Sequence, residues 1–340
     1  MKLDAPRPLG LALLATLCLA PTAHAQAPSK ASGSVERLDP RIDKLIPPDA
    51  TLQRLGDGYD WSEGPVWIKK GGYLLFSDVP KNTVYLFKPK GSGISPFLKP
   101  SGYTGTTPRG GEPGSNGLTL DPEGRLVLCQ HGDRRVSRLN DDGKTFTTLA
   151  DKFEGKRFNS PNDAVFDKAG NLYFTDPPYG LVGNVNDPAK ELPFSGVYRV
   201  AKDGKVSLLT KELKFPNGIA FSPDEKTLYV ASSDGKNPVI MAYPCTDDGI
   251  GAGKVVIDGS KLSNGRKGGF DGMKVDAAGN LFATGPGGVL VVAPDGTHLG
   301  TILTGQATAN CAWGDDGSTL YITADMYLCR IKTSTKGSGW

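Results

Sequence analysis

The chain has 340 residues, including 45 glycines and 26 prolines, and a formal net charge of only +3. It has no basic stripe and no interleaved aromatic platform, which excludes a dedicated nucleic-acid-binding protein. Helical periodicity is scarce and turn signals recur about every 8–12 residues, so the composition indicates an all-β chain.

The first 25 residues have the features of a secretory signal. Lys2 and Arg7 precede an apolar run over residues 9–20, and Ala23-His-Ala25 is a typical cleavage site. The apolar run is too short to span a bilayer stably. We expect cleavage after Ala25 and a periplasmic or secreted product with no membrane insertion.

Residues 26–49 are polar and weakly patterned, so we expect a loose N-terminal arm there. Residues 50–55 alternate between apolar and polar side chains and predict a strand. In a ring-shaped repeat fold the N-terminal strand commonly completes the last repeat, which removes the open sheet edges. We therefore expect this strand to pair with the final repeat.

A strand–turn–strand unit occurs six times. The third copy, residues 162–176, shows it clearly, with a turn over residues 167–170 between two apolar alternations. Successive copies begin 53, 46, 55, 54 and 39 residues apart. A period of roughly 40–50 residues with this content predicts one blade per copy. The sequence thus predicts a single six-bladed β-propeller over residues 50–332, followed by a C-terminal tail over 333–340.

Four segments rich in glycine, proline and polar residues interrupt the strands, at residues 100–114, 180–194, 236–253 and 264–269. They either roof one mouth of the propeller or serve as plain surface connections, and loops of this kind often carry functional residues.

The first residue of every copy is an acid or an amide. These residues are Glu63, Asn116, Asn162, Asn217, Asp271 and Asn310. Equivalent positions of innermost strands form a ring around the axis, and a ring of hard oxygens suits Ca²⁺. The alternative is that Asn-Gly and Asp-Gly simply begin each strand with a turn.

Four cysteines lie outside the signal: Cys129, Cys245, Cys311 and Cys329. No Cys-x-x-Cys or Cys/His spacing supports a zinc site. In an exported protein a disulfide is possible, and Cys311–Cys329 is the pair that we expect to form if any does.

Four motifs occur in order along the chain: Ser62-Glu-Gly-Pro-Val-Trp67, Arg157-Phe-Asn-Ser-Pro-Asn-Asp163, Phe215-Pro-Asn-Gly218 and Phe270-Asp-Gly-Met273. Together they resemble the bacterial gluconolactonase group of the SMP-30/gluconolactonase/luciferin-regenerating-enzyme family. The resemblance covers about residues 50–332.

The resemblance implies one divalent metal at the propeller axis, usually Ca²⁺, with Zn²⁺, Mn²⁺ or Mg²⁺ in some members. The ligand positions of the family fall on Glu63, Asn217 and Asp271, and Asn162 is either a ligand or a substrate contact. Asn116 is a further candidate for substrate binding.

Some relatives carry an arginine two residues before the blade-three amide to bind a sugar acid. Here that position is Ser160, with Arg157 further back. Arg157 is therefore a candidate substrate contact, and substrate recognition departs from the pattern of those relatives.

The implied activity is the opening of a sugar lactone, glucono-1,5-lactone or a related aldonolactone, to the aldonic acid. A bound cation polarises the carbonyl and lowers the pKa of a bound water. Asp271 is the candidate general base, or the group that orients the water. No Gly-x-Ser-x-Gly nucleophile elbow supports a serine hydrolase.

Two further side chains are candidates for substrate binding. His131 follows the second strand of copy two and either contacts substrate or is a hydrogen-bonded blade residue. Tyr179, in Asp176-Pro-Pro-Tyr179, either lines the pocket or packs as an ordinary aromatic residue.

Two other functions remain open. The same propeller and metal could hydrolyse phosphotriesters or other lactones, or the chain could be a non-catalytic binding scaffold with structural calcium. As partner we expect a small-molecule sugar lactone, and as assembly state a monomer or weak dimer.

Overall fold

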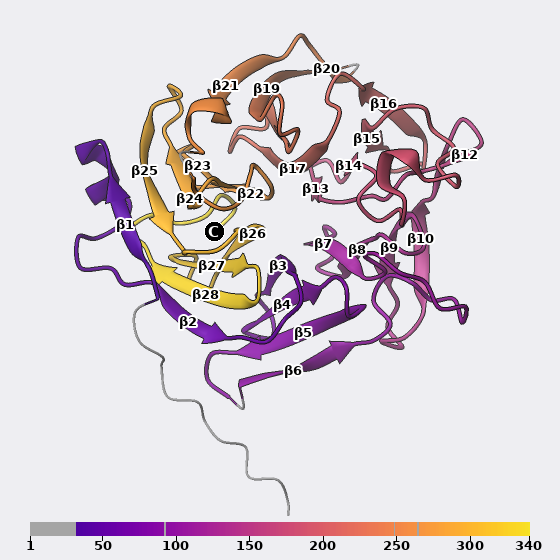
Figure 1. Cartoon of the computed structure of the whole chain (residues 1–340), viewed down its shortest axis with the longest axis horizontal. Helices are drawn as coiled ribbons and strands as arrows, with labels where there is room; N and C mark the ends of the chain where they lie inside the picture. The colour runs from indigo at the N-terminus through magenta and orange to yellow at the C-terminus, as the bar shows by residue number, and fades with distance from the viewer. Residues whose placement is uncertain (1–31, 92, 248, 264) are drawn as a thin grey trace, which may run out of the picture.

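The computed structural model describes residues 32–91, 93–247, 249–263 and 265–340. These residues form six sheets arranged around a common axis (Figure 1), which confirms the six-bladed β-propeller. The described part contains no α-helix, only three short 3-10 helices. None of its helices is long and apolar enough to cross a bilayer. The predicted signal and cleavage site lie outside the described residues and stay predictions.

The first three blades are regular four-stranded antiparallel sheets. Blade one is β3 (Ser62–Ile68), β4 (Tyr73–Asp78), β5 (Thr83–Lys88) and β6 (Gly93–Leu98). Blade two is β7 (Ser115–Leu120), β8 (Leu126–Gln130), β9 (Arg135–Leu139) and β10 (Phe146–Ala150). Blade three is β13 (Ala164–Phe166), β14 (Leu172–Asp176), β15 (Gly196–Val200) and β16 (Val206–Thr210). Before blade three, the short hairpin β11 (Lys152–Phe153) and β12 (Lys156–Arg157) projects from the ring.

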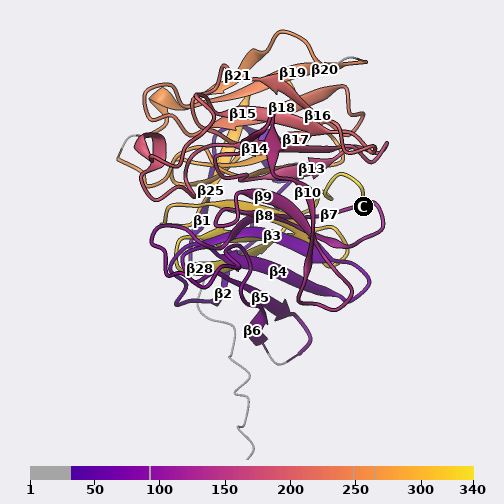
Figure 2. The same ribbon diagram turned by 90° about the vertical axis from the view of Figure 1, so that its right-hand side faces the viewer.

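Blades four and five each carry a fifth strand, and blade six takes one of its four strands from the N-terminal part of the chain. Blade four is β17 (Pro216–Phe221), β18 (Thr227–Ser232), β19 (Val239–Thr246), β20 (Gly249–Ile250) and β21 (Lys254–Asp258). Blade five is β22 (Met273–Val275), β23 (Leu281–Gly285), β24 (Gly288–Val292) and β25 (His298–Leu303), with β1 (Ser34–Arg37) at its edge. Blade six is β26 (Asn310–Gly314), β27 (Thr319–Ala324), β28 (Tyr327–Lys332) and β2 (Gln53–Gly56). Figure 2 shows blades one to four following one another from bottom to top.

The apolar core lies between neighbouring blades. One cluster joins Val127 and Val136 of blade two to Phe174 and Tyr198 of blade three. Another joins blades five and six. Alternating apolar residues point to both faces of each sheet, and each face packs on the next blade, which is why the middle strands, such as β8, are buried along their whole length. The core is thus a ring of blade contacts that fixes the inner strand ends relative to one another.

The predicted ring closure is confirmed. Strand β2 pairs antiparallel with β28, with Gln53 opposite Arg330 and Arg54 opposite Cys329. The side chain of Arg330 donates to Oε1 of Gln53 at 3.0 Å. The two ends of the propeller are therefore joined by a backbone ladder within one blade.

The expectation of a loose arm is wrong for the described part of residues 26–49. Strand β1 pairs with β25, and the 3-10 helix η1 (Pro40–Lys44) follows it. Ile42 and Ile46 are fully buried against blades five and six, and Glu36 pairs with Arg266 at 2.7 Å. A few well-placed apolar side chains fix this segment, although its average composition is polar. The tail is also fixed, since the backbone of Gly337 pairs with that of Asp276.

The expected disulfide is not present, and all four cysteines are free. Cys311 lies on β26 and Cys329 on β28, both opposite Ile322 of the intervening strand β27. Two strand spacings separate the pair by about 9–10 Å, beyond the reach of a disulfide. Both thiols instead pack as small apolar groups in the core between blades five and six.

The direction of the strands shows at which end of the propeller the inserted loops lie. Each innermost strand starts where the ring residues lie, so the connection from β6 to β7 and the segment between β14 and β15 leave the blades at that same end. The segments over 100–114 and 180–194 therefore belong to this mouth. The segment 236–253 is not a loop as expected, because residues 239–246 form β19, which pairs along its length with β18.

Candidate functional site

Four of the six predicted ring residues lie in the first two positions of innermost strands, and Asn162 and Asp271 lie two residues before β13 and β22. Figure 1 shows these innermost strands around the axis. Each of these strands contacts the innermost strand of the next blade, from β3 to β7 and around to β26 and β3 again. Five ring residues are buried, with Glu63 only 1% exposed. Asp271 is partly exposed as a residue, although its Oδ1 atom is buried. The structure thus brings the sequence-predicted oxygens together.

Backbone bonds between blades hold the ring closely packed. The amide of Gly117 donates to the carbonyl of Asn162 at 2.7 Å, and that of Gly218 donates to the carbonyl of Asp271 at 3.1 Å. A Cβ atom on Gly218 would lie 2.2 Å from that same carbonyl oxygen. The glycine after the ring residue is therefore required by close approach of the neighbouring strand. This explains the repeated Asn-Gly and Asp-Gly pairs better than a turn does.

Replacing Gly272 with alanine is expected to destabilise the domain by about 1–3 kcal/mol, because a Cβ there would lie 2.0 Å from Cγ of the buried Asn310. Urea unfolding followed by tryptophan fluorescence measures the loss. Gly235→Ala is the matched control, since a Cβ at Gly235 meets nothing within 4 Å. Equal stability of the two variants would contradict the close-packed ring.

Hydroxyl groups on the second strands of blades one and three connect these blades to the next ones. Ser77 Oγ donates to the carbonyl of Asn116 at 2.9 Å, and Thr175 Oγ1 donates to the carbonyl of Asn217 at 2.7 Å. These bonds engage the backbone of the ring residues and leave their side chains free to turn toward the axis. Neither hydroxyl was singled out from the sequence.

Four ring oxygens have no protein partner. Oδ1 of each of Asn116, Asn162, Asn217 and Asp271 is buried and accepts no hydrogen bond within the described residues. An unsatisfied buried acceptor costs about 1–3 kcal/mol. Four such unpaired oxygens in one ring indicate a role other than stabilising the fold.

The ring fits a divalent cation of the hard type. Ca²⁺ takes carboxylate, amide and water oxygens in a flexible geometry. The described residues contain no metal cluster made of three or more His, Cys, Asp or Glu side chains, so a site here depends on the amides. The residues available to hold the cation are Glu63, Asn116, Asn162, Asn217 and Asp271.

Asn310 differs from the other five ring residues. Its Oδ1 atom accepts a hydrogen bond from the backbone amide of Cys311 at 2.9 Å. Its side chain also acts on the carboxyl groups of Glu63 and Asp163 and partly offsets the rise in their pKa. Asn310 therefore does not present a free oxygen to the centre.

Three carboxyl groups share this buried region. Burial, with the nearby Asp163 charge, raises the pKa of Glu63 to about 8. Burial and then the charge of Glu63 raise the pKa of Asp271 well above its usual range, and burial likewise raises the pKa of Asp163. In the absence of a cation, the site retains protons.

We expect the stability of the metal-free protein to fall as the pH rises from about 4.5 to about 8. The unfolded chain releases the Glu63 proton near 4.5, whereas the folded chain keeps it up to its raised pKa of about 8. Each pH unit in this window costs about 1.4 kcal/mol at most, and the loss is complete above the folded pKa. Thermal melts in EDTA between pH 5 and pH 9 measure it.

Glu63→Gln is the control for this pH dependence, because it removes the titrating group and keeps a similar shape. Its melting temperature in EDTA is expected to vary less with pH than that of the wild type. Parallel curves for the two proteins would show that Glu63 does not titrate in this window.

His131 lies at the mouth, beneath the loop that follows β14. It is fully buried, and a Cβ on Gly180 would lie 2.5 Å from Cβ of His131. Its Nδ1 atom is 3.0 Å from Oε2 of Glu112, although neither ring nitrogen has an aligned hydrogen bond. The His131 ring thus lies beside a carboxylate at the mouth, and its contact with substrate stays a prediction.

Tyr179 stacks on Phe215, with ring centroids 5.7 Å apart and an interplanar angle of 15°. Burial raises the pKa of Tyr179, and the charge of Asp271 acts in the same direction. Tyr179 therefore packs as an aromatic residue and also lies within electrostatic range of the ring.

Arg157 lies on β12, and its described contacts are at the rim. Its Nη2 atom donates to the carbonyl of Asp133 at 2.9 Å. Ser160 is buried, donates to the carbonyl of Pro177 at 2.6 Å and accepts from the amide of Gly180 at 2.8 Å. Where some relatives carry the sugar-binding arginine, this chain uses a serine to fasten the loop over residues 177–180.

Two charged residues at the mouth, Arg109 and Glu112, were not predicted from the sequence, and both lie in the segment between β6 and β7. Arg109 donates from Nη1 to the carbonyl of Gly132 at 2.8 Å and from Nη2 to that of Gly180. Desolvation lowers the pKa of Arg109. Glu112 acts electrostatically on both Glu63 and Asp271. Glu112 lies in a segment between two copies of the repeat, so its position carries no repeat-based signal.

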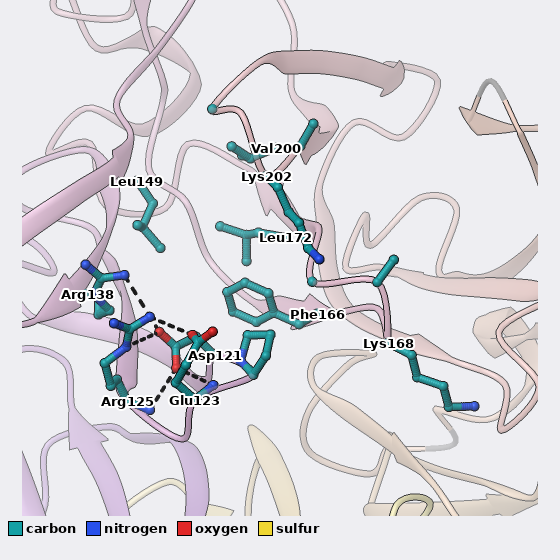
Figure 3. A pocket seen from close by; sticks show the side chains of 15 residues that line it. Asp121, Glu123, Arg125, Arg138, Leu149, Phe166, Lys168, Leu172, Val200 and Lys202 are labelled. Atoms are coloured by element: carbon teal, nitrogen blue, oxygen red, sulfur yellow. Dashed lines mark hydrogen bonds and ion pairs between the residues drawn. The ribbon is translucent and has the colours of Figure 1, made fainter.

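A separate cleft of about 480 Å³ lies between blades two and three (Figure 3). It is lined by the β7–β8 and β13–β14 turns, at the end of the strands away from the ring. Figure 3 shows Arg125 and Arg138 directed toward Asp121, and Arg125 binds this carboxylate at 2.7 Å. No ring residue lines the cleft, and its two acids, Asp121 and Glu123, pair with its arginines.

The family model described as the SMP-30/Gluconolactonase/LRE-like region matches residues 61–325. The gluconolactonase of Zymomonas mobilis is 40% identical over 312 residues, covering 90% of this chain and 87% of the relative. The pentonolactonase XacC of Haloferax volcanii is 26% identical, covering 77% of this chain and 80% of the relative.

A solved gluconolactonase from Xanthomonas campestris has 29% identity and a TM-score of 0.76, covering 91% of this chain and 99% of that chain. The matched range reaches all six blades and includes the six ring residues. The chain therefore belongs to the SMP-30/gluconolactonase/LRE-like family.

Proposed function

We propose that this protein hydrolyses a sugar lactone, glucono-1,5-lactone or a related aldonolactone, to the aldonic acid, with the help of one divalent cation. The observation that carries the proposal is the set of four buried, unpaired oxygens in the ring. The 40% identity to a gluconolactonase over most of both chains supports the substrate class.

The proposed reaction adds water to the lactone carbonyl and breaks the ring C–O bond. The hydroxide portion stays on the carbonyl carbon, one proton goes to the ring oxygen, and the acid releases its proton near neutral pH. When bound, a divalent cation polarises the carbonyl and stabilises negative charge on its oxygen. Ca²⁺ suits a mixed set of amide and carboxylate oxygens best, and Mn²⁺, Mg²⁺ and Zn²⁺ are alternatives.

We assign the proton-handling role to Asp271. Its Oδ1 atom accepts no protein hydrogen bond, so it is free to accept one from the attacking water. Glu63, Asn162 and Asn217 are proposed to hold the cation, and Asn116 has the same unpaired oxygen available for cation or substrate.

The mouth residues are proposed to bind substrate hydroxyl groups. His131 has two ring nitrogens without aligned partners, and Glu112 lies beside it with an accessible carboxylate. Tyr179 borders the same region. Arg157 is less suited, because its guanidinium is engaged at the rim.

A proton-release assay with three substrates tests the proposal: glucono-1,5-lactone, a longer aliphatic lactone and a phosphotriester. Each is measured against its own uncatalysed rate, because gluconolactone opens spontaneously. We expect the highest kcat/KM with gluconolactone. Preference for the phosphotriester or the aliphatic lactone would favour a different hydrolase, and no turnover of any would favour a binding scaffold. We also propose, on the signal sequence alone, that the enzyme acts outside the cytoplasm.

A further inference from the structure

A second buried layer lies directly beside the oxygen ring. Asp163 follows Asn162, at the position where blades one, two, four and five have glycine. It is 1% exposed, and its Oδ1 atom accepts from the amide of Ala164 at 2.9 Å. Its Oδ2 atom is buried with no aligned partner in the described residues. A carboxylate in this position is costly unless a positive charge compensates it.

Asn310 connects this carboxylate to the ring. Its Oδ1 atom receives the Cys311 amide and also lies 3.5 Å from Nζ of Lys274. The Asn310 side chain also acts on the carboxyl groups of Glu63 and Asp163 and partly offsets the rise in their pKa. One amide thus contacts an ammonium group and lies within electrostatic range of two carboxyl groups.

Lys274 supplies that ammonium group from β22, the innermost strand of blade five. Its Nζ atom donates to the carbonyl of Met273 at 3.0 Å, so the side chain folds back along the strand. The charge of Lys274 also acts on Asp163 and Cys311, which lie on the innermost segments of blades three and six. The ammonium group of Lys274 therefore lies beside Asn310 and within electrostatic range of Asp163.

The formal charges of these side chains sum to the value that one divalent cation would neutralise. Glu63, Asp163 and Asp271 carry three negative charges when ionised, and Lys274 carries one positive charge. The remainder of two matches one divalent cation. Glu112 is a fourth acid nearby, but its side chain is 34% exposed and it lies at the mouth, where solvent screens it.

We propose that Lys274 is an internal counter-ion, which neutralises Asp163 and limits the affinity of the centre for divalent cations. The inference rests on the cation-binding part of the proposed function. Without the ammonium, the excess negative charge attracts a divalent cation more strongly. With the ammonium, the centre is balanced when one such ion is bound.

A charge-balance cycle tests this proposal without any measurement of turnover. Ca²⁺ dissociation constants are measured by competition with a chelating dye for the wild type, Lys274→Met, Asp163→Asn and the double variant. We expect Lys274→Met to bind Ca²⁺ at least about tenfold more tightly and Asp163→Asn at least about tenfold more weakly. The double variant restores the balance and is expected to return close to the wild-type value.

A purely structural role for Lys274 predicts a different result, because loss of packing weakens binding in both single variants. Unchanged or weaker binding by Lys274→Met overturns the inference. If that variant fails to fold, as judged by circular dichroism, Asp163→Asn alone tests the balance, and undiminished binding there overturns it. If the wild type binds no divalent cation, the cation-binding part of the proposed function is wrong, and this inference is wrong with it. If the wild type binds Ca²⁺ and the variants bind it with the same dissociation constant, only this inference is wrong.

Discussion

Asp271→Asn is expected to lower kcat for glucono-1,5-lactone by about 10²–10⁴-fold while the domain remains folded. The Oδ1 atom of Asp271 is buried and unpaired, and an amide in its place cannot take up a proton. The variant still offers an amide oxygen, as Asn162 and Asn217 do, so the ring geometry is expected to persist. Steady-state kinetics at saturating Ca²⁺ separate the loss of chemistry from weaker cation binding.

Asp141→Asn is the matched control for this substitution, because Asp141 is exposed in the turn between β9 and β10, away from the ring. It is expected to leave kcat unchanged. Near-wild-type turnover by Asp271→Asn under saturating Ca²⁺ would refute the proton-handling role and leave Asp271 as a ligand at most.

A chain that begins at Asp57 is expected to lose the cooperative fold of the whole domain. It lacks β2, which pairs with β28, and it lacks Leu52, which is 1% exposed between blades five and six. Without β2, blade six has an open edge and the ring is no longer joined. Thermal unfolding followed by circular dichroism measures the loss.

A chain that begins at Ala50 separates ring closure from simple truncation. It lacks β1 and η1 but keeps β2, so we expect a cooperative transition at a lower temperature than that of the full chain. If both truncated chains melt like the full chain, the N-terminal strand does not close the propeller.

The sequence predicted the propeller and its ring of oxygens because both follow from the repeat of the strand–turn–strand unit. Six copies with an acid or amide at the same place fix the architecture, and the glycine after four of these residues reflects the close approach of neighbouring strands. Where contacts between residues far apart in the chain decide the local structure, the spacing of the repeat gives no information about it. Ile42 and Ile46 anchor an apparently polar segment in this way.

The roles within the ring could be predicted only in part. Asn310 looks like Asn116 in the sequence, yet its oxygen is taken by the amide of Cys311, whereas that of Asn116 has no partner. Glu112 reaches His131 from a loop outside the repeat. The expected disulfide failed for a geometric reason, because both cysteines lie in one blade with a strand between them.

The most direct test of the central claim is the catalysed proton release from glucono-1,5-lactone before chelation, after removal of bound metal with EDTA, and after return of Ca²⁺. The proposed function predicts that the rate falls to the uncatalysed level after EDTA and recovers as one equivalent of cation binds to the oxygen ring. Full activity in protein shown to be free of divalent metal would contradict it.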